Sequence, residues 1–387
     1  MDTGRGTAKR LAGAGVGAGG APTLEDVARA AGVSRATVSR VVNGVRNVDP
    51  AIREAVRRAV AATGYVPNRA ARSLVTRRSG TVALVVSGAG AGAGAGAAGV
   101  RDGFAARVFE DPFFGRVVGG VAGALRPAGV HPVLMFADTG EDRAEVLAYL
   151  AHGSADGALL VTTHPRDPLP GMLAAAGLPA VLFARPPAGV PLDHVDLAHR
   201  EGGALAARHL LGLGRGRLAA IGGPADVPAS RERMAGFREA ADGKADKGGR
   251  DGKDGEHGRG GHPGRPGVLR VAEGDFTLDG GERAMRRLLA EQPDLDGVFA
   301  ANDLMAQGAC LVLREHGRRI PEDVAVVGFD DSGAASACRP RLTTVRQPVE
   351  EMAAEMVRLL LDRVAGTAAP EPASVLFAPA LVIRDSA

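Results

Sequence analysis

The stretch TLEDVARAAGVSRATVSRVVN, residues 23–43, decides the fold of the N-terminal part of the chain. Thr23 can cap a first helix, which Gly32 would end by permitting a left-handed turn, and Ser34 can cap a second helix. Apolar residues recur at helical spacing in both segments, at Leu24, Val27, Ala28, Ala31, Val38, Val41 and Val42. Because only Gly32, Val33 and Ser34 connect the two helices, the pattern predicts a helix-turn-helix.

The second helix of such a motif enters the DNA major groove by its N-terminal end. An arginine there can bind guanine through two hydrogen bonds, and Asn, Ser or Thr side chains can reach bases or phosphates. The residues predicted to contact DNA are Thr23, Leu24, Ser34, Arg35, Ala36, Thr37, Ser39, Arg40 and Asn43. The alternative is an ordinary three-helix bundle whose arginine-rich face is only solvated.

A third helix is expected after Asp49, with Ile52, Val56 and Val60 facing the other two helices. The charge of this region favours DNA binding over the alternative. Residues 1–80 carry 14 Lys and Arg against 5 Asp and Glu, whereas the net charge of the whole chain is only +3. A basic segment on an acidic remainder is typical of a protein that binds a polyanion through that segment.

The composition restricts the class of protein further. The chain has 387 residues, of which 45% are hydrophobic, and this length corresponds to about two to three domains. Cys310 and Cys338 are the only cysteines, too few for a disulfide framework or a four-cysteine zinc site. No apolar run has the length of a signal peptide core or a membrane span, so we expect a cytoplasmic protein with no membrane partner.

From Thr81 onward, short apolar runs alternate with amphipathic segments, a pattern that predicts an α/β fold with parallel sheets. The predicted strands are 81–86, 133–137, 158–161, 180–184, 218–221, 268–271, 298–301 and 324–327. The predicted helices are 114–125, 142–152, 200–211, 230–241, 278–290 and 303–316. Residues 88–99 and 242–267 have too little apolar surface to order themselves, so we expect flexible insertions there and a disordered leader at 1–21.

Together, TLEDVARAAGVSRATVSRVVNG and the later GYVPNRAARSL resemble the lactose/galactose repressor (LacI/GalR) family of transcriptional regulators. The resemblance continues through DPFF at 111–114, ADGALLV at 155–161, IGGP at 221–224, RERMAGFREA at 231–240, FAANDLMAQGA at 299–309, PEDVAVVGFDD at 321–331 and LTTVRQP at 342–348. It implies an N-terminal three-helix helix-turn-helix DNA-binding domain plus an α/β periplasmic-binding-protein-like domain of two Rossmann-like subdomains.

The resemblance also implies domain boundaries. A helix-turn-helix domain at 22–66, a hinge helix and linker at 67–80 and an effector-binding and dimerisation domain at 81–387 are expected. The first subdomain is expected at about 81–186 plus 346–365, and the second at about 187–345 plus the C-terminal strands, with about three chain crossings between them.

The resemblance implies a hinge helix at Asn68–Val75, in which Asn68 and Arg69 contact the DNA backbone and Leu74 enters the minor groove as an apolar wedge. Insertion of such a side chain unstacks a base step and kinks the duplex. So short a helix is not stable alone, so we expect it to form only when two copies pack together on DNA. The alternative is that Leu74 is a linker residue that packs on the effector-binding domain.

An effector site in the cleft between the subdomains is implied at Phe113, Phe114, Arg233, Asn302 and Asp330. The polar members suit a polyol, because a carboxylate, an amide and a guanidinium together accept and donate hydrogen bonds. Structural alternatives exist as well: Arg233 could form an ion pair with Glu232 or Asp226. Asp330 and Asp331 could cap the next segment, and both phenylalanines could be core.

Two positions depart from the family pattern and bear on the identity of the ligand. Ala184 stands at a strand end where members often carry an acidic residue, and Leu197 stands where Asn is common.

The chain carries no HExxH, GxSxG or CxxC motif, and GLGRGR at 212–217 follows a helix, the wrong order for a dinucleotide loop. We therefore expect no enzyme activity, no catalytic or metal-binding residue and no cofactor. The expected function is that of a repressor, with a near-palindromic double-stranded DNA operator, a small carbohydrate-like effector and a second copy of the chain as partners. The alternatives are a solute-binding protein or enzyme of the same α/β fold, and a DNA-binding protein that has lost its effector.

Overall fold

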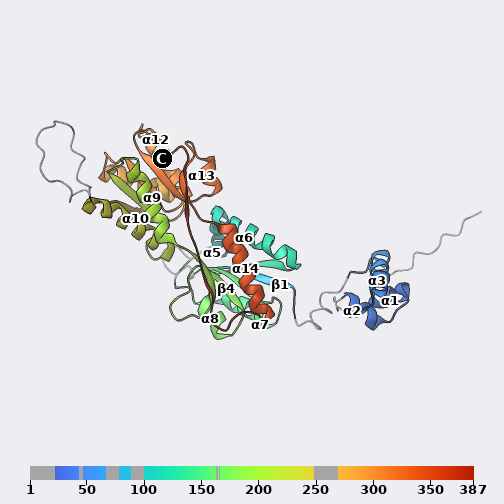
Figure 1. Cartoon of the computed structure of the whole chain (residues 1–387). Helices are drawn as coiled ribbons and strands as arrows, with labels where there is room; N and C mark the ends of the chain where they lie inside the picture. The colour runs from blue at the N-terminus through green and yellow to red at the C-terminus, as the bar shows by residue number, and fades with distance from the viewer. Residues whose placement is uncertain are drawn as a thin grey trace, which may run out of the picture. The chain divides into compact units, whose positions relative to one another are not determined.

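The computed structural model describes residues 22–42, 47–66, 78–88, 100–162, 164, 166–247 and 269–387. The chain divides into two compact units, Met1–Ser79 and Gly80–Ala387, which are described in turn (Figure 1). Four residues predicted to contact DNA lie outside the described residues: Asn43, Asn68, Arg69 and Leu74.

The N-terminal unit contains the helices α1 (Leu24–Ala31), α2 (Arg35–Val42) and α3 (Pro50–Thr63). α1 begins with a capping box, in which the Asp26 amide donates to the Thr23 hydroxyl and the Thr23 amide donates to the Asp26 carboxylate. Gly32 ends α1 with a φ of 65°, a left-handed conformation that glycine adopts without strain. The three-helix arrangement predicted from the sequence is confirmed.

A small apolar core holds these three helices together. Its buried side chains are Val27, Val38, Val56, Ala59 and Tyr65, and most of the other predicted core residues are partly buried against them. The prediction for Ile52 is wrong, because its side chain lies in the first turn of α3 and is 37% exposed. A core of this size leaves much of the surface of α2 free to contact another molecule.

The larger unit contains two six-stranded sheets. The first has the order β11-β5-β4-β3-β1-β2, and all its neighbouring strands are parallel. Its strands are β1 (Thr81–Ser87), β2 (His131–Ala137), β3 (Ala158–Thr162), β4 (Ala180–Phe183), β5 (Asp193–Leu197) and β11 (Ser374–Phe377). The helices of this half are α5 (Val100–Glu110), α6 (Pro112–Leu125), the short 3-10 helix η1 (Arg126–Ala128), α7 (Gly140–Ala151), α8 (Leu169–Ala175) and α14 (Val349–Ala365).

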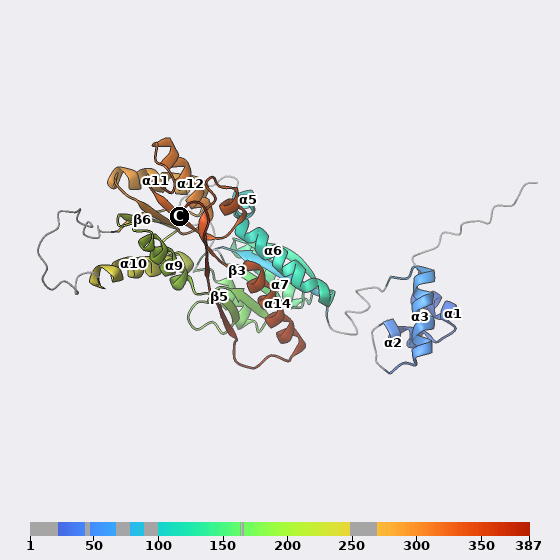
Figure 2. The ribbon, with the colours of Figure 1, turned by 45° about the horizontal axis from the view of Figure 1, so that its top comes forward.

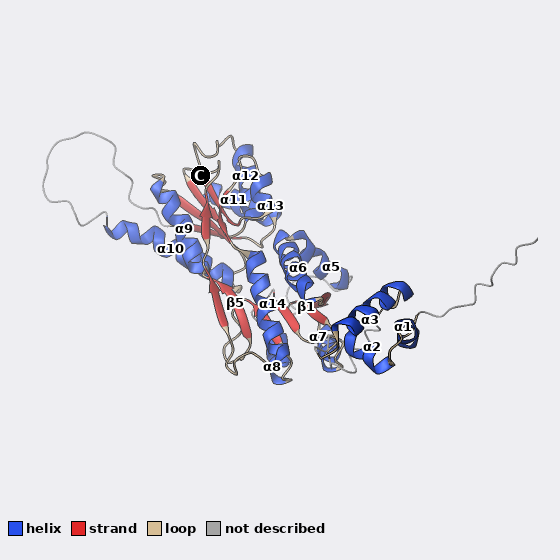
Figure 3. Cartoon of the chain, turned by 45° about the vertical axis from the view of Figure 1, so that its right-hand side comes forward, coloured by secondary structure: helices blue, strands red, loops and turns tan. Residues whose placement is uncertain are grey.

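The second sheet has the order β12-β10-β9-β8-β6-β7, and only β12 is antiparallel to its neighbour. Its strands are β6 (Leu218–Gly222), β7 (Arg270–Glu273), β8 (Gly297–Ala300), β9 (Ala325–Asp330), β10 (Thr343–Arg346) and β12 (Ala380–Val382). Its helices are α9 (His199–Gly212), α10 (Pro228–Lys247), α11 (Leu278–Glu291), α12 (Asp303–Glu315) and α13 (Gly333–Ala337). Figure 3 shows the strands in red among the covering helices in blue, the α/β arrangement that the sequence predicts.

The chain passes between the two halves of this unit after β5, after β10 and between β11 and β12 (Figures 1 and 2). The structure differs here from the predicted subdomain boundary at residue 187, because β5 and β11 both belong to the first sheet. β5 was not predicted because its sequence is polar. It can nevertheless be a buried strand, because the guanidinium of Arg363 on α14 compensates the carboxylate of Asp193. Likewise, α10 continues to Lys247, past the predicted start of the second insertion.

Glycines allow helices to pack closely in both halves. A Cβ atom on Gly203 of α9 would lie 1.9 Å from the carbonyl oxygen of Arg233 on α10, and Gly236 makes a similarly close approach in the other direction. In the first half, a Cβ atom on Gly120 of α6 would lie 2.8 Å from the Cβ of Ala353 on α14. These helix pairs therefore pack nearly backbone to backbone, which fixes the side chains that they carry.

Candidate functional site

A cleft of about 1350 Å³ lies between the two sheets, next to the carboxyl ends of several strands. Ligands of α/β proteins commonly bind at this edge of a sheet. All five residues predicted to bind an effector line the cleft: Phe113, Phe114, Arg233, Asn302 and Asp330. Among the lining side chains, eight are acidic and five are arginines, so the cleft does not favour an anionic ligand.

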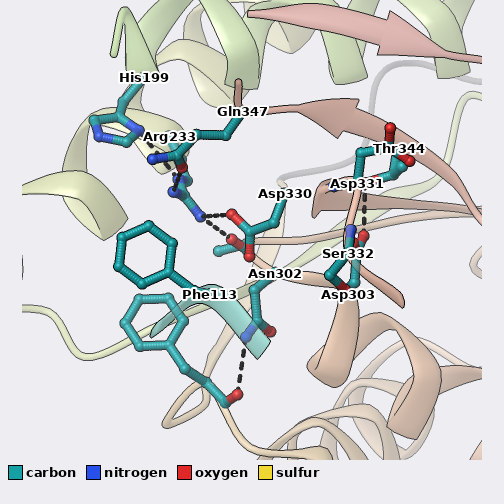
Figure 4. A network of polar contacts seen from close by, with 12 residues as sticks. Phe113, His199, Arg233, Asn302, Asp303, Asp330, Asp331, Ser332, Thr344 and Gln347 are labelled. Atoms are coloured by element: carbon teal, nitrogen blue, oxygen red, sulfur yellow. Dashed lines mark hydrogen bonds and ion pairs between the residues drawn. The ribbon is translucent and has the colours of Figure 1, made fainter. Parts of the chain in front are cut away.

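Arg233, on α10, is at the centre of the polar side of the cleft (Figure 4). Its Nη1 donates to the carbonyl oxygen of Ala301 at 2.6 Å and to Oδ1 of Asp330 at 3.3 Å. Its Nη2 donates to Oε1 of Gln347 at 3.1 Å, and its Nε donates to Nδ1 of His199 at 3.2 Å. Among the described residues, four of its five N–H groups thus have partners, and one on Nη2 remains for a ligand.

Asp330, the last residue of β9, has an unusual backbone and an unusual environment. Its φ of 102° lies in the region that favours glycine, and its side chain is only 12% exposed. Burial raises the pKa of Asp330 to about 8, although Arg233 acts in the opposite direction. A carboxyl group that keeps its proton near neutral pH can donate a hydrogen bond to a ligand as well as accept one.

Asn302 caps α12 and is anchored on both sides of its amide. Its Oδ1 accepts the Met305 amide at 2.9 Å, and its Nδ2 donates to the carbonyl oxygen of Phe276 at 2.8 Å. Asn302 therefore has a structural role as a helix cap, in addition to lining the cleft. One amide hydrogen and one lone pair are left after these two bonds.

Asp303 joins the segments behind this polar side. Its carboxylate accepts the Ser332 amide at 2.7 Å and the Thr344 hydroxyl at 2.6 Å, which links the start of α12 to the segment after β9 and to β10 (Figure 4). Burial raises the pKa of Asp303 to about 6. These bonds hold the strand ends that carry the cleft residues in a fixed arrangement.

The opposite side of the cleft carries three rings, Phe113, Phe114 and Phe183. α6 begins at Asp111, whose carboxylate accepts the Phe113 amide at 2.9 Å. The Phe113 ring packs edge-to-face against Phe114, at 5.2 Å between centroids, and against Phe183 at 5.3 Å. Phe114 also packs on a buried apolar cluster around Phe104, so Phe113 is the ring better placed to contact a ligand.

Two residues that sequence reasoning did not select, His199 and Gln347, also line the cleft and bond to Arg233. Burial lowers the pKa of His199 well below its usual value, and Arg233 adds to the effect, so the imidazole is neutral and accepts a hydrogen bond. Both residues lie directly beside a chain crossing, after β5 and after β10. Gln347 belongs to the LTTVRQP segment already noted, and this was the signal that could have identified it.

One contact spans the two sides of the cleft at its rim. His164 follows β3 in the first half, Asp226 follows β6 in the second, and His164 Nε2 lies 2.7 Å from Asp226 Oδ2. Nδ1 of His164 accepts the Arg166 amide, which leaves Nε2 to face the carboxylate. The cleft is thus closed at this point of its rim.

In the N-terminal unit, most of the described residues predicted to contact DNA lie on α2 or directly before it. Ser34, Arg35, Ala36 and Arg40 are exposed, and Thr37 and Ser39 are half-buried. Ser34 caps α2 by accepting the Thr37 amide at 3.1 Å, and Arg35 forms an exposed ion pair with Glu25 at 3.0 Å. Thr23 caps α1 and Leu24 packs on the core, so both also have structural roles.

Within the ranges that the structure describes, no three His, Cys, Asp or Glu side chains gather as metal ligands would. No helix there combines the length and the apolar composition that crossing a bilayer requires.

Two family profiles match the chain. The profile described as bacterial regulatory proteins of the lacI family matches residues 23–68, which include α1, α2 and α3. The profile described as a periplasmic binding protein-like domain matches residues 207–387 in the larger unit.

The chain is 45% identical over 368 residues to the HTH-type transcriptional regulator CelR of Thermobifida fusca. This alignment covers 94% of this chain and 98% of that protein. A solved CelR–cellobiose complex aligns with a TM-score of 0.66 at 42% identity, covering 95% of this chain and all of that one. The lac repressor dimer bound to operator and the anti-inducer ONPF aligns with a TM-score of 0.71 at 26% identity, covering 94% and 98%. This chain therefore belongs to the LacI family, whose members are DNA-binding transcriptional regulators and not enzymes.

Proposed function

We propose that this regulator is a repressor that binds a near-palindromic operator as a homodimer and leaves it when a neutral sugar occupies the cleft. The observation that carries the proposal is the cleft itself, with an aromatic ring on one side and a polar group of Arg233, Asn302 and Asp330 on the other. Rings pack on the apolar faces of sugars, and the polar group suits their hydroxyls. Because its partner is chromosomal DNA, we also propose a cytoplasmic location.

A disaccharide such as cellobiose is the effector that the comparisons and the cleft support best. CelR, solved with cellobiose, shares 42% of its aligned residues with this chain. The cleft volume of about 1350 Å³ exceeds the usual range for small-ligand sites, so more than one sugar ring has room. The excess of acidic lining groups, and the pairing of Arg233 with Asp330, argue against a phosphorylated sugar.

The experiment for the effector is a titration of operator DNA with the protein, with and without cellobiose, followed by fluorescence anisotropy. Wild-type protein should lose affinity for the operator as cellobiose is added, whereas Asp330→Ala should bind the operator normally and fail to release it. Glucose 6-phosphate is the control ligand and should have no effect. If the operator affinity of the wild-type protein changes with none of the neutral sugars tested, the protein has lost its effector.

For the DNA contacts we propose that α2 reads the major groove through Arg35 and Arg40, and that Asn68, Arg69 and Leu74 act as the hinge contacts implied by the family resemblance. Arg35→Ala should weaken operator binding by about 1–3 kcal/mol and binding to random DNA by less. Arg57→Ala removes an equally exposed arginine on α3 and is the matched control. Equal losses on operator and random DNA would show that Arg35 contacts only phosphates.

A further inference from the structure

Arg116 lies on α6, in the first half of the larger unit. It binds the second half at the place where the chain crosses between the two halves. Its Nη1 donates to the carbonyl oxygen of Asp330 at 2.8 Å, and its Nη2 donates to the carbonyl oxygen of Gln347 at 3.1 Å. The same guanidinium forms a two-pronged ion pair with Glu350 on α14, at 2.8 and 2.7 Å. One side chain of the first half thus holds the end of β9 and the crossing that follows β10.

The spacing along α6 connects this contact to the cleft. Phe113, Arg116 and Gly120 are three and four residues apart, and therefore share one face of the helix. Phe113 lines the cleft, Arg116 binds the crossing, and Gly120 lets α6 pack closely against α14. One rigid helix therefore carries both a ring that lines the cleft and the guanidinium that binds the crossing.

The carbonyl groups that Arg116 binds belong to the residues that hold the polar side. Asp330 has its φ of 102°, and a backbone in that region persists only where its surroundings hold it. The Asp330 carbonyl also accepts the Gln347 amide, and the side chains of both residues bond to Arg233. Arg116 therefore acts on the same residues as Arg233, from the opposite half of the molecule.

We infer that Arg116 is a positioning residue of the effector cleft, which fixes the backbone of Asp330 and Gln347 relative to the ring of Phe113. This inference rests on the proposed function of the cleft. Its role is distinct from that of the ion pair with Glu350, because only the two carbonyl contacts reach the cleft residues.

The first test needs no ligand and uses hydrogen–deuterium exchange on the full-length protein. The amides of Gln347 and Val349 donate to the two carbonyl groups that Arg116 binds. Arg116→Ala should exchange faster at these amides, since alanine has no donor for the two carbonyl groups. Arg116→Lys should exchange at an intermediate rate, since an ammonium group can donate but lacks the fixed fork of the guanidinium. Glu350→Gln keeps an acceptor for Arg116 and both carbonyl contacts, and should exchange as wild type does. Unchanged exchange in both Arg116 variants overturns the inference.

The second test measures cellobiose affinity by calorimetry. Arg116→Ala should bind on the order of tenfold more weakly, as expected for loss of charge-assisted hydrogen bonds. Glu350→Gln should bind as wild type does, as should Arg358→Ala, which removes exposed ion pairs elsewhere on α14.

The decisive comparison is the double variant. Added to Asp330→Ala, Arg116→Ala should weaken cellobiose binding less than it does alone, because part of its effect passes through the side chain of Asp330. A full additional loss, or an equal loss in Glu350→Gln, overturns the inference. If wild-type protein binds no cellobiose, the proposed effector is wrong, and the exchange measurement still decides the role of Arg116.

Discussion

The two halves of the body repeat one architecture but present different chemistry to the cleft between them. In both sheets the strands follow a similar order, and β4 and β9 occupy the same place, third from one edge. At the end of each of these strands stands a residue with positive φ, Ala184 at 118° and Asp330 at 102°. One half presents rings and a methyl group there, and the other presents a carboxyl group bound by an arginine. The backbone sets where a cleft forms, whereas single side chains decide what it binds.

Each half also buries one arginine against one aspartate. The first half buries Arg143 against Asp167, with the two side chains 7% and 1% exposed, and the second half buries Arg233 against Asp330. Only the second pair has a guanidinium that lines the cleft. The comparison therefore separates what stabilises the fold from what recognises a ligand.

The largest effect is expected from removal of these arginines. Arg143→Ala should lower the free energy of unfolding by about 3–5 kcal/mol, because it leaves the buried carboxyl group of Asp167 without its partner. Arg233→Ala should lower it by a similar amount, because four hydrogen bonds of a buried guanidinium are lost at once. Only Arg233→Ala should also abolish cellobiose binding. Urea unfolding and calorimetry measure the two effects, and Arg238→Ala, exposed on α10, is the control. A loss of binding in Arg143→Ala alone would reverse the assignment of the two sides.

The next effect concerns the glycines that bring helices together. Gly203→Ala should lower the free energy of unfolding by about 3 kcal/mol, because its methyl group meets a backbone carbonyl. Gly120→Ala should cost about 1 kcal/mol, because it meets the side-chain methyl of Ala353 and backbone atoms at longer distances. Gly212→Ala, at the end of α9 with open space around it, is the control in urea unfolding. Equal costs at Gly203 and Gly120 would show that the two helix pairs are equally tolerant.

A smaller effect depends on pH and on the second half alone. Burial raises the pKa of Asp330 from 3.8 to about 8, so between these values the folded protein binds a proton that the unfolded chain releases. This contribution to stability is fully present below the unfolded value and is lost as the pH rises toward 8. Relative to Asp330→Asn, wild type should lose about 1 kcal/mol per pH unit in this range. Unfolding curves whose difference stays constant from pH 5 to pH 8 would contradict the raised pKa.

The smallest effect tests the backbone at the end of β4. Ala184→Gly should raise the free energy of unfolding by about 1 kcal/mol, because glycine adopts a φ of 118° without strain. Ala180→Gly, in the same strand but buried with an ordinary backbone, should be destabilising and serves as the control. If Ala184→Gly is also destabilising, the two strand ends differ in backbone as well as in side chain.

The N-terminal unit could be predicted closely because its signals are local. The caps at Thr23, Ser34 and Asp49 act on amides two or three residues away, and this information is present in a short stretch of sequence. Strands with continuous apolar sequence, such as β1 and β6, were found for the same reason. β5 was missed because Asp193 is balanced by Arg363, a residue far away in the chain.

The same distinction applies to the cleft. Phe113, Arg233 and Asp330 were predicted from short motifs that the family resemblance supplies. Arg116 and His199 were not, because their importance comes from bonds to segments that only folding brings near. Sequence reasoning therefore gave the residues on the surface of the cleft better than those that hold them in place.

The passage of the chain from β11 to β12 has a consequence for synthesis in the cell. β11 completes the edge of the first sheet, β12 completes the edge of the second, and Ser386 is fully buried with bonds to Val326 of β9. Both sheets thus lack one edge strand until residues 374–386 have left the ribosome. The N-terminal unit, in contrast, can fold as soon as it emerges. During translation the nascent chain exposes the edges of β5 and β10, the surfaces most open to wrong pairing with another chain. Both halves that form the cleft therefore gain their last edge strand only when translation has reached these residues.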